Sequence, residues 1–277
     1  MVKLICTDID GTLLNKHREV DEYTRQVFRQ LAGRVPLVLA SSRMPRALWY
    51  IQQALGVEDM PLICYNGALV LSAGRSFTYR LVLSSEEISH DTVQSITGMA
   101  ASHNVHYSIY HNNHWIASGA DQWTEREISN THTAPDVILD DLSLLKRNTH
   151  QPAHKIMMMG KPEKLDKIAA ALSGAAAISL CRSKDTYLEI TPAGINKSLA
   201  LQHLLGSIDK FKDIAMAAVM TFGDNHNDYE LIRDVGYGIA VGNGIQPLKD
   251  IAYAVTAANH EHGVARYLEA HFGLGKK

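Results

Sequence analysis

Short apolar runs alternate with amphipathic stretches along the first part of the chain, and polar or turn-forming residues follow each run. The runs 4–7, 36–40 and 61–65 predict three strands, with a helix after each of the first two. We expect Asp21 to cap a helix that ends near Ala32, and Pro45 to open a helix that Gly56 stops. Asn66-Gly67 then predicts a hairpin of 68–71 with 77–82. This alternation is typical of a parallel sheet covered by helices.

The pattern changes after Leu83. Ser84-Ser85-Glu86-Glu87 resembles a helix start, and that helix is expected to reach Ser102. A polar turn, His111-Asn112-Asn113-His114, separates two short apolar runs and predicts another hairpin. The remaining expected elements are helices at 121–132 and 162–172 and strands at 155–159, 177–181 and 187–190. Helices mixed with hairpins in this way indicate an α+β module with an antiparallel sheet.

The first pattern returns after Pro192. It predicts helices at 196–205, 227–234, 246–250 and 264–271, with strands at 217–222, 238–241 and 253–255. The predicted fold class is therefore α/β, a doubly wound parallel sheet interrupted by an inserted α+β domain. Residues 1–83 and 191–277 form the expected core domain, and residues 84–190 form the insertion.

Charge and composition exclude several classes of partner. Lys and Arg number 27 against 29 Asp and Glu, which gives a net charge of −2 with no block of five like charges. This balance predicts neither nucleic acid nor a membrane surface as partner. No apolar run approaches the ~20 residues of a membrane span, and the first residues lack the apolar segment of a signal peptide. Cys6, Cys64 and Cys181 lie in apolar runs, so we expect buried, reduced thiols and a cytoplasmic location.

Two carboxylates follow the first predicted strand. Asp8 and Asp10 are two residues apart, so both side chains project to one side at the carboxyl edge of the sheet. Ligands bind at that edge in open α/β sheets. Two like charges there require a protonated carboxyl or a cation, and a set of oxygen ligands favours Mg2+. The alternative is a helix cap and turn, since Asp-Gly is common turn chemistry.

A second acidic cluster, Asp224 and Asp228, follows the strand predicted at 217–222. If both sheet edges face one crevice, Asp8, Asp10 and Asp224 can supply oxygens to a single Mg2+. Asp228 is then a further ligand or a group that orients one. Taken alone, either motif could equally be a polar surface loop.

Two more positions suit an anion. Ser41 and Ser42 end the second strand just before a helix, where a hydroxyl and backbone N–H groups can meet an anion. Lys197 opens another helix, where the helix dipole disfavours a cation, so an anionic partner is expected. The alternative for Lys197 is a solvated lysine at a helix end.

Together these segments resemble the haloacid dehalogenase-like phosphatases, and within them the Cof-type subfamily with a class II cap. The resemblance covers the whole chain. It is carried by Asp8-Ile9-Asp10-Gly11-Thr12, Ser41, Gly194-Ile195-Asn196-Lys197 and Gly223-Asp224-x-x-Asn227-Asp228, and by Asn66-Gly67-Ala68 and the stretch 259–265. Ser42 departs from the pattern, because the family usually has glycine before the arginine found here at 43.

The resemblance implies a Rossmann-like core, a cap and a division of roles. Asp8 would be the nucleophile that forms an aspartyl-phosphate, and Asp10 the acid and then the base. Mg2+ would be held by Asp8, the main-chain oxygen of Asp10 and Asp224. The phosphoryl oxygens would be bound by Ser41, the amides of Ser42 and Ile9, Lys197 and Asn227.

The expected activity is Mg2+-dependent hydrolysis of a small phosphorylated metabolite, with sugar phosphates ahead of nucleotides. Polar residues of the insertion are expected to select it: His111, Asn113, Arg182 and Lys184. A phosphomutase or phosphotransferase is the first alternative, although residues 84–190 have no dense arginine cluster for a second phosphate. A phospho-accepting signalling domain is the second, but such domains are about half this size. A zinc site at His106, His111 and His114 is not expected, because no cysteine or acid completes it.

Overall fold

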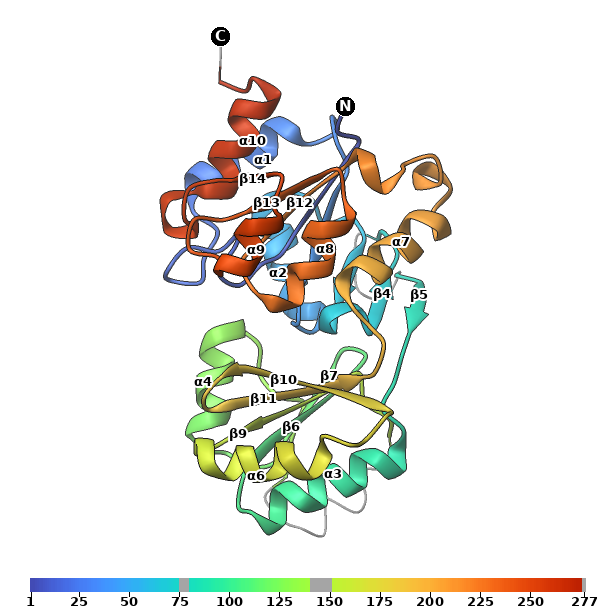
Figure 1. Ribbon diagram of the computed structural model, residues 1–277, viewed down its shortest axis with the longest axis vertical. Coiled ribbons are helices and arrows are strands. Elements are labelled where there is room, and N and C mark those ends of the chain that lie inside the picture. The colour runs from blue at the N-terminus through green and yellow to red at the C-terminus, as the bar shows by residue number, and fades with distance from the viewer. Residues whose placement is uncertain (75–79, 140–150, 276–277) are drawn as a thin grey trace. The chain divides into compact units, whose positions relative to one another are not determined.

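The computed structural model describes residues 1–74, 80–139 and 151–275 (Figure 1). The chain divides into two compact units. One contains Met1–Ser84 together with Asn196–Lys277, and the other is Ser85–Ile195. The second unit is thus inserted between two segments of the first.

The sheet of the first unit has the strand order β14-β13-β12-β1-β2-β3-β4-β5. Its strands are β1 (Leu4–Thr7), β2 (Leu37–Ala40), β3 (Leu62–Cys64), β4 (Leu69–Leu71), β5 (Val82–Ser85), β12 (Val219–Gly223), β13 (Tyr237–Ala240) and β14 (Ala254–Val255). β1 pairs in parallel with β2 on one side and with β12 on the other, whereas β3 and β4 are antiparallel. The carboxyl ends of β1, β2 and β12 therefore meet at one edge.

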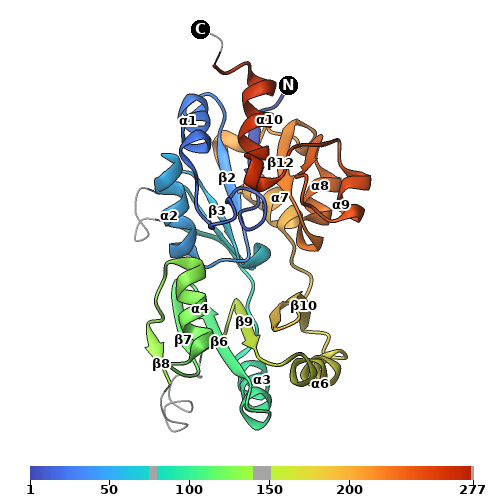
Figure 2. The same ribbon diagram turned by 90° about the vertical axis from the view of Figure 1, so that its left-hand side faces the viewer.

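Helices cover both faces of this sheet, as Figure 2 shows with α1 and α2 on one side and α7 and α8 on the other. The helices are α1 (Glu22–Leu31), α2 (Pro45–Leu55), α7 (Lys197–Ser207), α8 (Tyr229–Asp234), α9 (Gln246–Ile251) and α10 (Gly263–Phe272). α1 packs against α2 and α10, while α8 packs against α7 and α9. This arrangement confirms the predicted doubly wound α/β fold.

The predicted helix ends have the expected local chemistry. The Asp21 carboxylate accepts a hydrogen bond from the Thr24 N–H at 2.8 Å and caps α1. α2 begins at Pro45 and stops at Gly56, whose φ of 72° is left-handed. The sequence therefore specifies these two boundaries directly.

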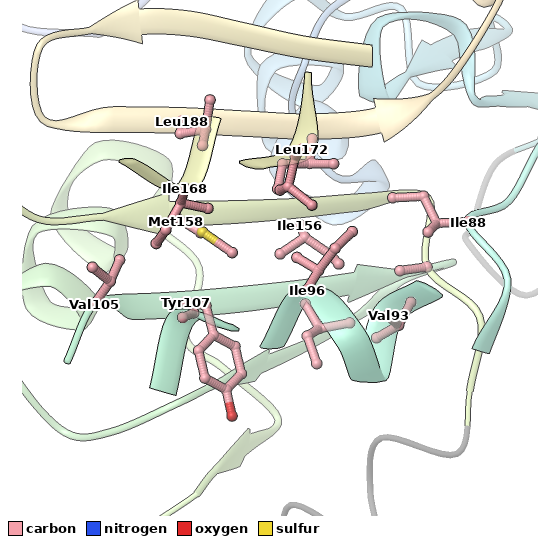
Figure 3. Packing of buried hydrophobic residues seen from close by; sticks show 14 of the residues in the cluster. Ile88, Val93, Ile96, Val105, Tyr107, Ile156, Met158, Ile168, Leu172 and Leu188 are labelled. Atoms are coloured by element: carbon pink, nitrogen blue, oxygen red, sulfur yellow. The ribbon is translucent and has the colours of Figure 1, made fainter. Parts of the chain in front are cut away.

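The second unit is an α+β module around a sheet of order β10-β11-β9-β6-β7-β8. Its elements are β6 (His106–His111), β7 (His114–Ala117), β8 (Val137–Ile138), β9 (Lys155–Met159), β10 (Ile178–Lys184), β11 (Tyr187–Pro192), α3 (His90–Ser102), α4 (Gln122–Thr131) and α6 (Pro162–Leu172). All described pairings in this sheet are antiparallel except that of β7 with β8. Residues of α3 and α6 form one apolar core with alternate residues of β6, β9 and β11 (Figure 3).

Two local predictions differ from the structure. Residues 84–87 do not start a helix, because β5 runs to Ser85 and Ile88 exchanges backbone hydrogen bonds with Ala153. α3 begins only at His90, capped by the Ser89 side chain. Cys181 is exposed, because β10 is an edge strand, whereas Cys6 and Cys64 are buried.

The predicted hairpin after Asn66-Gly67 is also modified. Residues 65–67 form the 3-10 turn η1 (Tyr65–Gly67). β4 lies between β3, with which it pairs in antiparallel fashion, and β5, which is the edge strand of the sheet. Residues 75–79 of the expected second strand lie outside the described residues. Across the described part of the chain, no helix has both the length and the apolarity to cross a membrane.

The core of the insertion gives a stability prediction. Leu188 of β11 is fully buried in the apolar cluster, whereas Leu81 is 71% exposed. Leu188→Ala should lower the free energy of unfolding by about 2–5 kcal/mol, because it removes buried methyl groups and leaves a cavity. Leu81→Ala is the control, with an expected change within about 0.5 kcal/mol. Urea denaturation measures both, and equal effects would contradict the assigned core.

Candidate active site

Three segments meet at the carboxyl edge of the parallel sheet. Asp8 follows β1, Ser41 follows β2 and Asp224 follows β12. Thr7 pairs with Leu39 on one side and with Phe222 on the other, so the ends of the three strands are aligned. The structure thus brings together residues that the sequence separates by up to about two hundred positions.

Lys197 lies at the centre of this edge and is fully buried. Its Nζ donates to Asp8 Oδ1 at 2.5 Å and to Asp228 Oδ1 at 2.6 Å. Burial alone would lower the pKa of Lys197, but the charges of Asp228 and Asp8 and their hydrogen bonds raise it. The lysine is therefore a charged link between the two acidic segments, and the alternative of a solvated side chain is wrong.

The carboxylates outnumber the single ammonium. Asp8, Asp224 and Asp228 each offer an oxygen atom, and these atoms lie within 4.8 Å of one another. Burial raises the pKa of Asp8, and the charges of Asp228 and Asp224 raise it further against the effect of Lys197. Burial and the charge of Asp228 likewise raise the pKa of Asp224 to about 6. A divalent cation would relieve this repulsion, and hard oxygen donors are those that Mg2+ prefers.

Asp228 has both carboxylate oxygens occupied. Oδ1 accepts from Lys197, and Oδ2 accepts from the backbone N–H groups of Asp224 at 3.0 Å and Asn225 at 3.2 Å. These bonds fix the loop after β12. Asp228 is thus arranged to hold Lys197 and Asp224 in place.

Gly11 forms a tight contact with Asp224. Its φ is +84°, and a Cβ atom at this position would lie 2.5 Å from Asp224 Oδ2. The neighbouring Thr12 hydroxyl donates to Asp224 Oδ1 at 2.8 Å, and the Asn243 side chain donates to the Gly11 carbonyl at 2.8 Å. The loop after β1 therefore needs glycine both for its backbone conformation and for space.

Asp10 is held by two arginines. Arg43 donates to both oxygens of Asp10, each at 2.7 Å, and an Arg18 nitrogen lies 3.4 Å from Oδ1. Burial would raise the pKa of Asp10, but the hydrogen bonds and charge of Arg43 outweigh it, with help from Arg18, and lower the pKa. Asp10 is therefore an ionised carboxylate in this arrangement. Arg43 is not among the site residues predicted from the sequence, although it lies beside Ser42.

The other predicted phosphate-binding residues lie along the same edge. The Ser41 hydroxyl accepts from the Arg43 N–H at 3.2 Å, and α2 begins at Pro45, beyond Ser42. Ile9 is buried in the loop after β1. The Asn227 side chain donates to Asn66 Oδ1 at 3.0 Å. The resemblance had included Asn66 only as part of a subfamily pattern.

The four polar residues expected to select substrate are not gathered in one place. His111 and Asn113 lie at the β6–β7 hairpin, whereas Arg182 and Lys184 lie on β10, the opposite edge strand of the described sheet. The pairing of Lys184 with Tyr187, and of Tyr187 with Met159, puts Lys184 near the His106 end of β6. The two pairs therefore occupy different ends of the sheet. A part in substrate selection stays a prediction for all four.

The structure reveals a cluster in the insertion that sequence spacing does not show. Glu87, His111 and His154 have side-chain atoms close enough to share an ion. However, His154 Nδ1 accepts from the Asn112 N–H at 3.0 Å, and burial lowers the pKa of His154 to about 4. A neutral imidazole has only one lone pair, so its Nε2 carries the proton and cannot bind a metal. The cluster is a hydrogen-bonded network.

Known proteins share this architecture. The family model for haloacid dehalogenase-like hydrolases matches residues 5–268. The chain belongs to this family. Its resemblance to the Cof-type members is confirmed. The phosphatase YitU of Bacillus subtilis, named for 5-amino-6-(5-phospho-D-ribitylamino)uracil, is 28% identical over 293 residues and 98% of each chain.

Two further relatives extend the comparison. The HMP-PP phosphatase of Serratia proteamaculans is 28% identical over 97% of this chain and 95% of its own. The crystal structure of a haloacid dehalogenase-like hydrolase from Bacteroides thetaiotaomicron has a TM-score of 0.87 and 26% identity. It covers 98% of this chain and all of that one. This Cof-type chain is accordingly a phosphomonoester hydrolase with a Rossmann-like core and an inserted cap.

The contact between Gly11 and Asp224 predicts a specific loss. Gly11→Ala should lower phosphatase activity at least tenfold, because the methyl group would displace the Asp224 carboxylate. Gly33→Ala is the matched control, since Gly33 also has a positive φ, +75°, but nothing lies within 4 Å of its added Cβ. Both variants should lose about 1 kcal/mol of stability from backbone strain. Steady-state rates on an aryl phosphate separate the two effects, and equal activities would refute the steric argument.

Proposed function

We propose that the protein is a Mg2+-dependent phosphatase that hydrolyses small phosphorylated metabolites, with sugar phosphates as the first class, through an aspartyl-phosphate. The observation that supports this most strongly is the buried contact of Lys197 with Asp8 and Asp228. It joins three chain segments around one ammonium group. The similarity to named phosphatases supports the same reaction class.

Asp8, Asp224 and the main-chain oxygen of Asp10 are the proposed ligands of Mg2+. The excess of carboxylates over ammonium and the raised pKa values of Asp8 and Asp224 fit a divalent cation. The ion would supply positive charge between the nucleophilic carboxylate and the phosphoryl dianion. Asp228 acts as an orienting residue, since Lys197 and two backbone N–H groups occupy its oxygens.

Asp8 is the proposed nucleophile. One of its carboxylate oxygens forms a bond to phosphorus while the bond from phosphorus to the substrate alcohol breaks. A water molecule then attacks the phosphorus of the aspartyl-phosphate, inorganic phosphate leaves and the Asp8 carboxylate is restored. Lys197, Ser41, Asn227 and the amides of Ser42 and Ile9 would bind the phosphoryl oxygens, so that positioning and electrostatics carry most of the catalysis.

Asp10 is the proposed acid in the first step and base in the second. As a carboxylate paired with Arg43, it is in the ionisation state that accepts a proton from the attacking water. Donation to the leaving alcohol needs a protonated Asp10, and the ion pair with Arg43 disfavours that state. The acid step therefore requires the hydrogen bonds from Arg43 to Asp10 to weaken when substrate is bound.

The insertion is proposed to act as the cap that chooses the substrate. The proposed catalytic and metal-binding residues all belong to the first unit, so the chemistry does not need groups from Ser85–Ile195. Named relatives act on a phosphoribitylamino-uracil and on HMP-PP, which are both small phosphorylated metabolites.

The buried thiols of Cys6 and Cys64 fit a cytoplasmic protein.

The nucleophile can be tested directly. Asp8→Asn should reduce turnover at least about 1,000-fold, the scale of loss for an essential nucleophile. The fold should survive, because Lys197 keeps its bond to Asp228. Asp209→Asn, which changes a carboxylate that is 95% exposed, should leave turnover unchanged. Phosphate release and circular dichroism check both variants, and retained turnover in Asp8→Asn would remove Asp8 from the mechanism.

The metal requirement gives an independent prediction. Activity should disappear when a chelator removes divalent ions and return with Mg2+. Replacement by Ca2+ should leave at most about a tenth of the rate, because Ca2+ accepts more oxygens at longer distances and allows the carboxylate to leave its in-line position. The measurement is phosphate release at saturating concentrations of each ion. Similar rates with both ions would argue against an organised Mg2+ site.

A further inference from the structure

The turn η1, at residues 65–67, has an unusual backbone. Tyr65 and Asn66 both have positive φ, 54° and 58°, and Gly67 has a φ of 111°. Two consecutive left-handed residues other than glycine are costly, by about 1–3 kcal/mol each, and persist only where the surroundings fix them. Tyr65 is fully buried, so this conformation is held inside the molecule.

The backbone of the turn is tied to the loop after β2. The Asn66 N–H donates to the Ser41 carbonyl at 2.9 Å, and the Tyr65 N–H donates to the Arg43 carbonyl at 3.3 Å. Ser41 is a proposed phosphate ligand, and Arg43 is the partner of Asp10. The turn therefore fixes the backbone on both sides of Ser42.

The side chain of Asn66 reaches a second segment. Its Oδ1 accepts from Asn227 Nδ2 at 3.0 Å, and both residues are half-buried. The Asn227 amide has two N–H groups, and this bond uses one of them. The bond fixes the plane of the amide, so the direction of the remaining N–H is set by Asn66.

The same turn also contacts the segment that carries Lys197. A Cβ atom on Gly67 would lie 2.6 Å from the Asn196 carbonyl oxygen, and Asn196 is the N-cap of α7. Only glycine allows this approach at a φ of 111°. One turn thus touches three of the segments proposed to bind phosphate.

We propose that Asn66 is a positioning residue of the phosphate site, which aligns the Asn227 amide with the Ser41–Ser42 loop without binding the phosphate itself. This inference rests on the proposed function. The backbone N–H of Asn66 holds the Ser41–Ser42 loop, and the Oδ1 of Asn66 holds the Asn227 amide. The left-handed conformation is what allows one residue to make both bonds.

A double-mutant cycle on the 277-residue chain tests this role. Asn66→Gly keeps a residue that tolerates the left-handed backbone and removes only the side chain. Asn227→Ala removes the amide that the Asn66 side chain orients. We expect Asn66→Gly to lower kcat/KM about tenfold and to weaken inhibition by inorganic phosphate, because a bound anion loses an oriented donor. In the Asn227→Ala background, Asn66→Gly should change both quantities by less than twofold.

Asn104→Gly is the matched control. Asn104 also has a positive φ, 49°, but it is exposed in the second unit. It should match the unaltered enzyme in kcat/KM and in phosphate inhibition. Thermal melts establish that each variant is folded.

Two results would overturn the proposal. Equal losses from Asn66→Gly with and without Asn227 would mean that Asn66 contacts the substrate itself. No loss in Asn66→Gly would mean that the bond to Asn227 does not matter. If Asn66→Gly does not fold, Asn66→Asp decides in its place, because it keeps an acceptor oxygen. Its kcat should stay within about threefold of the unaltered value, and a loss as large as that of Asn227→Ala would reject the role.

Failure of the inference can be told apart from failure of the proposed function. If Asp8→Asn is inactive while Asn66→Gly is unaffected, only the role of Asn66 is lost. If Asp8→Asn remains active, the aspartyl-phosphate mechanism fails, whatever Asn66 does.

Discussion

The site depends on the buried ion pairs that the Lys197 ammonium makes with Asp8 and Asp228. The ammonium lies between two carboxylates from the loops after β1 and β12, and all three side chains are almost wholly removed from water. Removing the ammonium would leave both carboxylates buried without a counter-ion, and an uncompensated buried charge costs about 3–5 kcal/mol. The remaining excess of negative charge has no protein counter-ion in the described cluster, so the protein holds Asp8 and Asp224 close together at an energetic cost. That arrangement fits the cation and the anionic substrate that we propose for this site.

Much of this architecture could be predicted from the sequence, because its signals are local. The alternation of apolar runs with capped helices predicted the parallel sheet, and α1, α2, β1 and β9 lie within a residue or so of their expected positions. Asp8 and Asp224 could be chosen because charged residues directly after apolar strands are costly without a function. Lys197 could be chosen because a cation at the start of a helix is disfavoured by the helix dipole. The common position of the two aspartates follows from the geometry of parallel strands.

Other features depend on contacts between distant segments, which no local pattern reveals. Separate loops are joined by the two hydrogen bonds from Arg43 to Asp10 and by the hydrogen bond between Asn227 and Asn66. The start of α3 was misplaced because Ser84-Ser85-Glu86-Glu87 has the composition of a helix cap, whereas pairing of Ile88 with Ala153 keeps the chain extended. Cys181 is exposed because the order of strands in the sheet, and not its apolar neighbours, decides its burial.

The central position of β1 has a consequence for how the chain folds. Leu4 pairs with Val219, so one edge of β1 has no partner until β12 is synthesised, more than two hundred residues later. During synthesis the strand can pair with β2, but its other edge stays open until β12 emerges. Unpaired apolar strand edges promote association between chains, and sheets built from such distant contacts form slowly. The connectivity that places the loops after β1 and β12 side by side thus also leaves an apolar strand edge of the nascent chain unpaired until β12 is made.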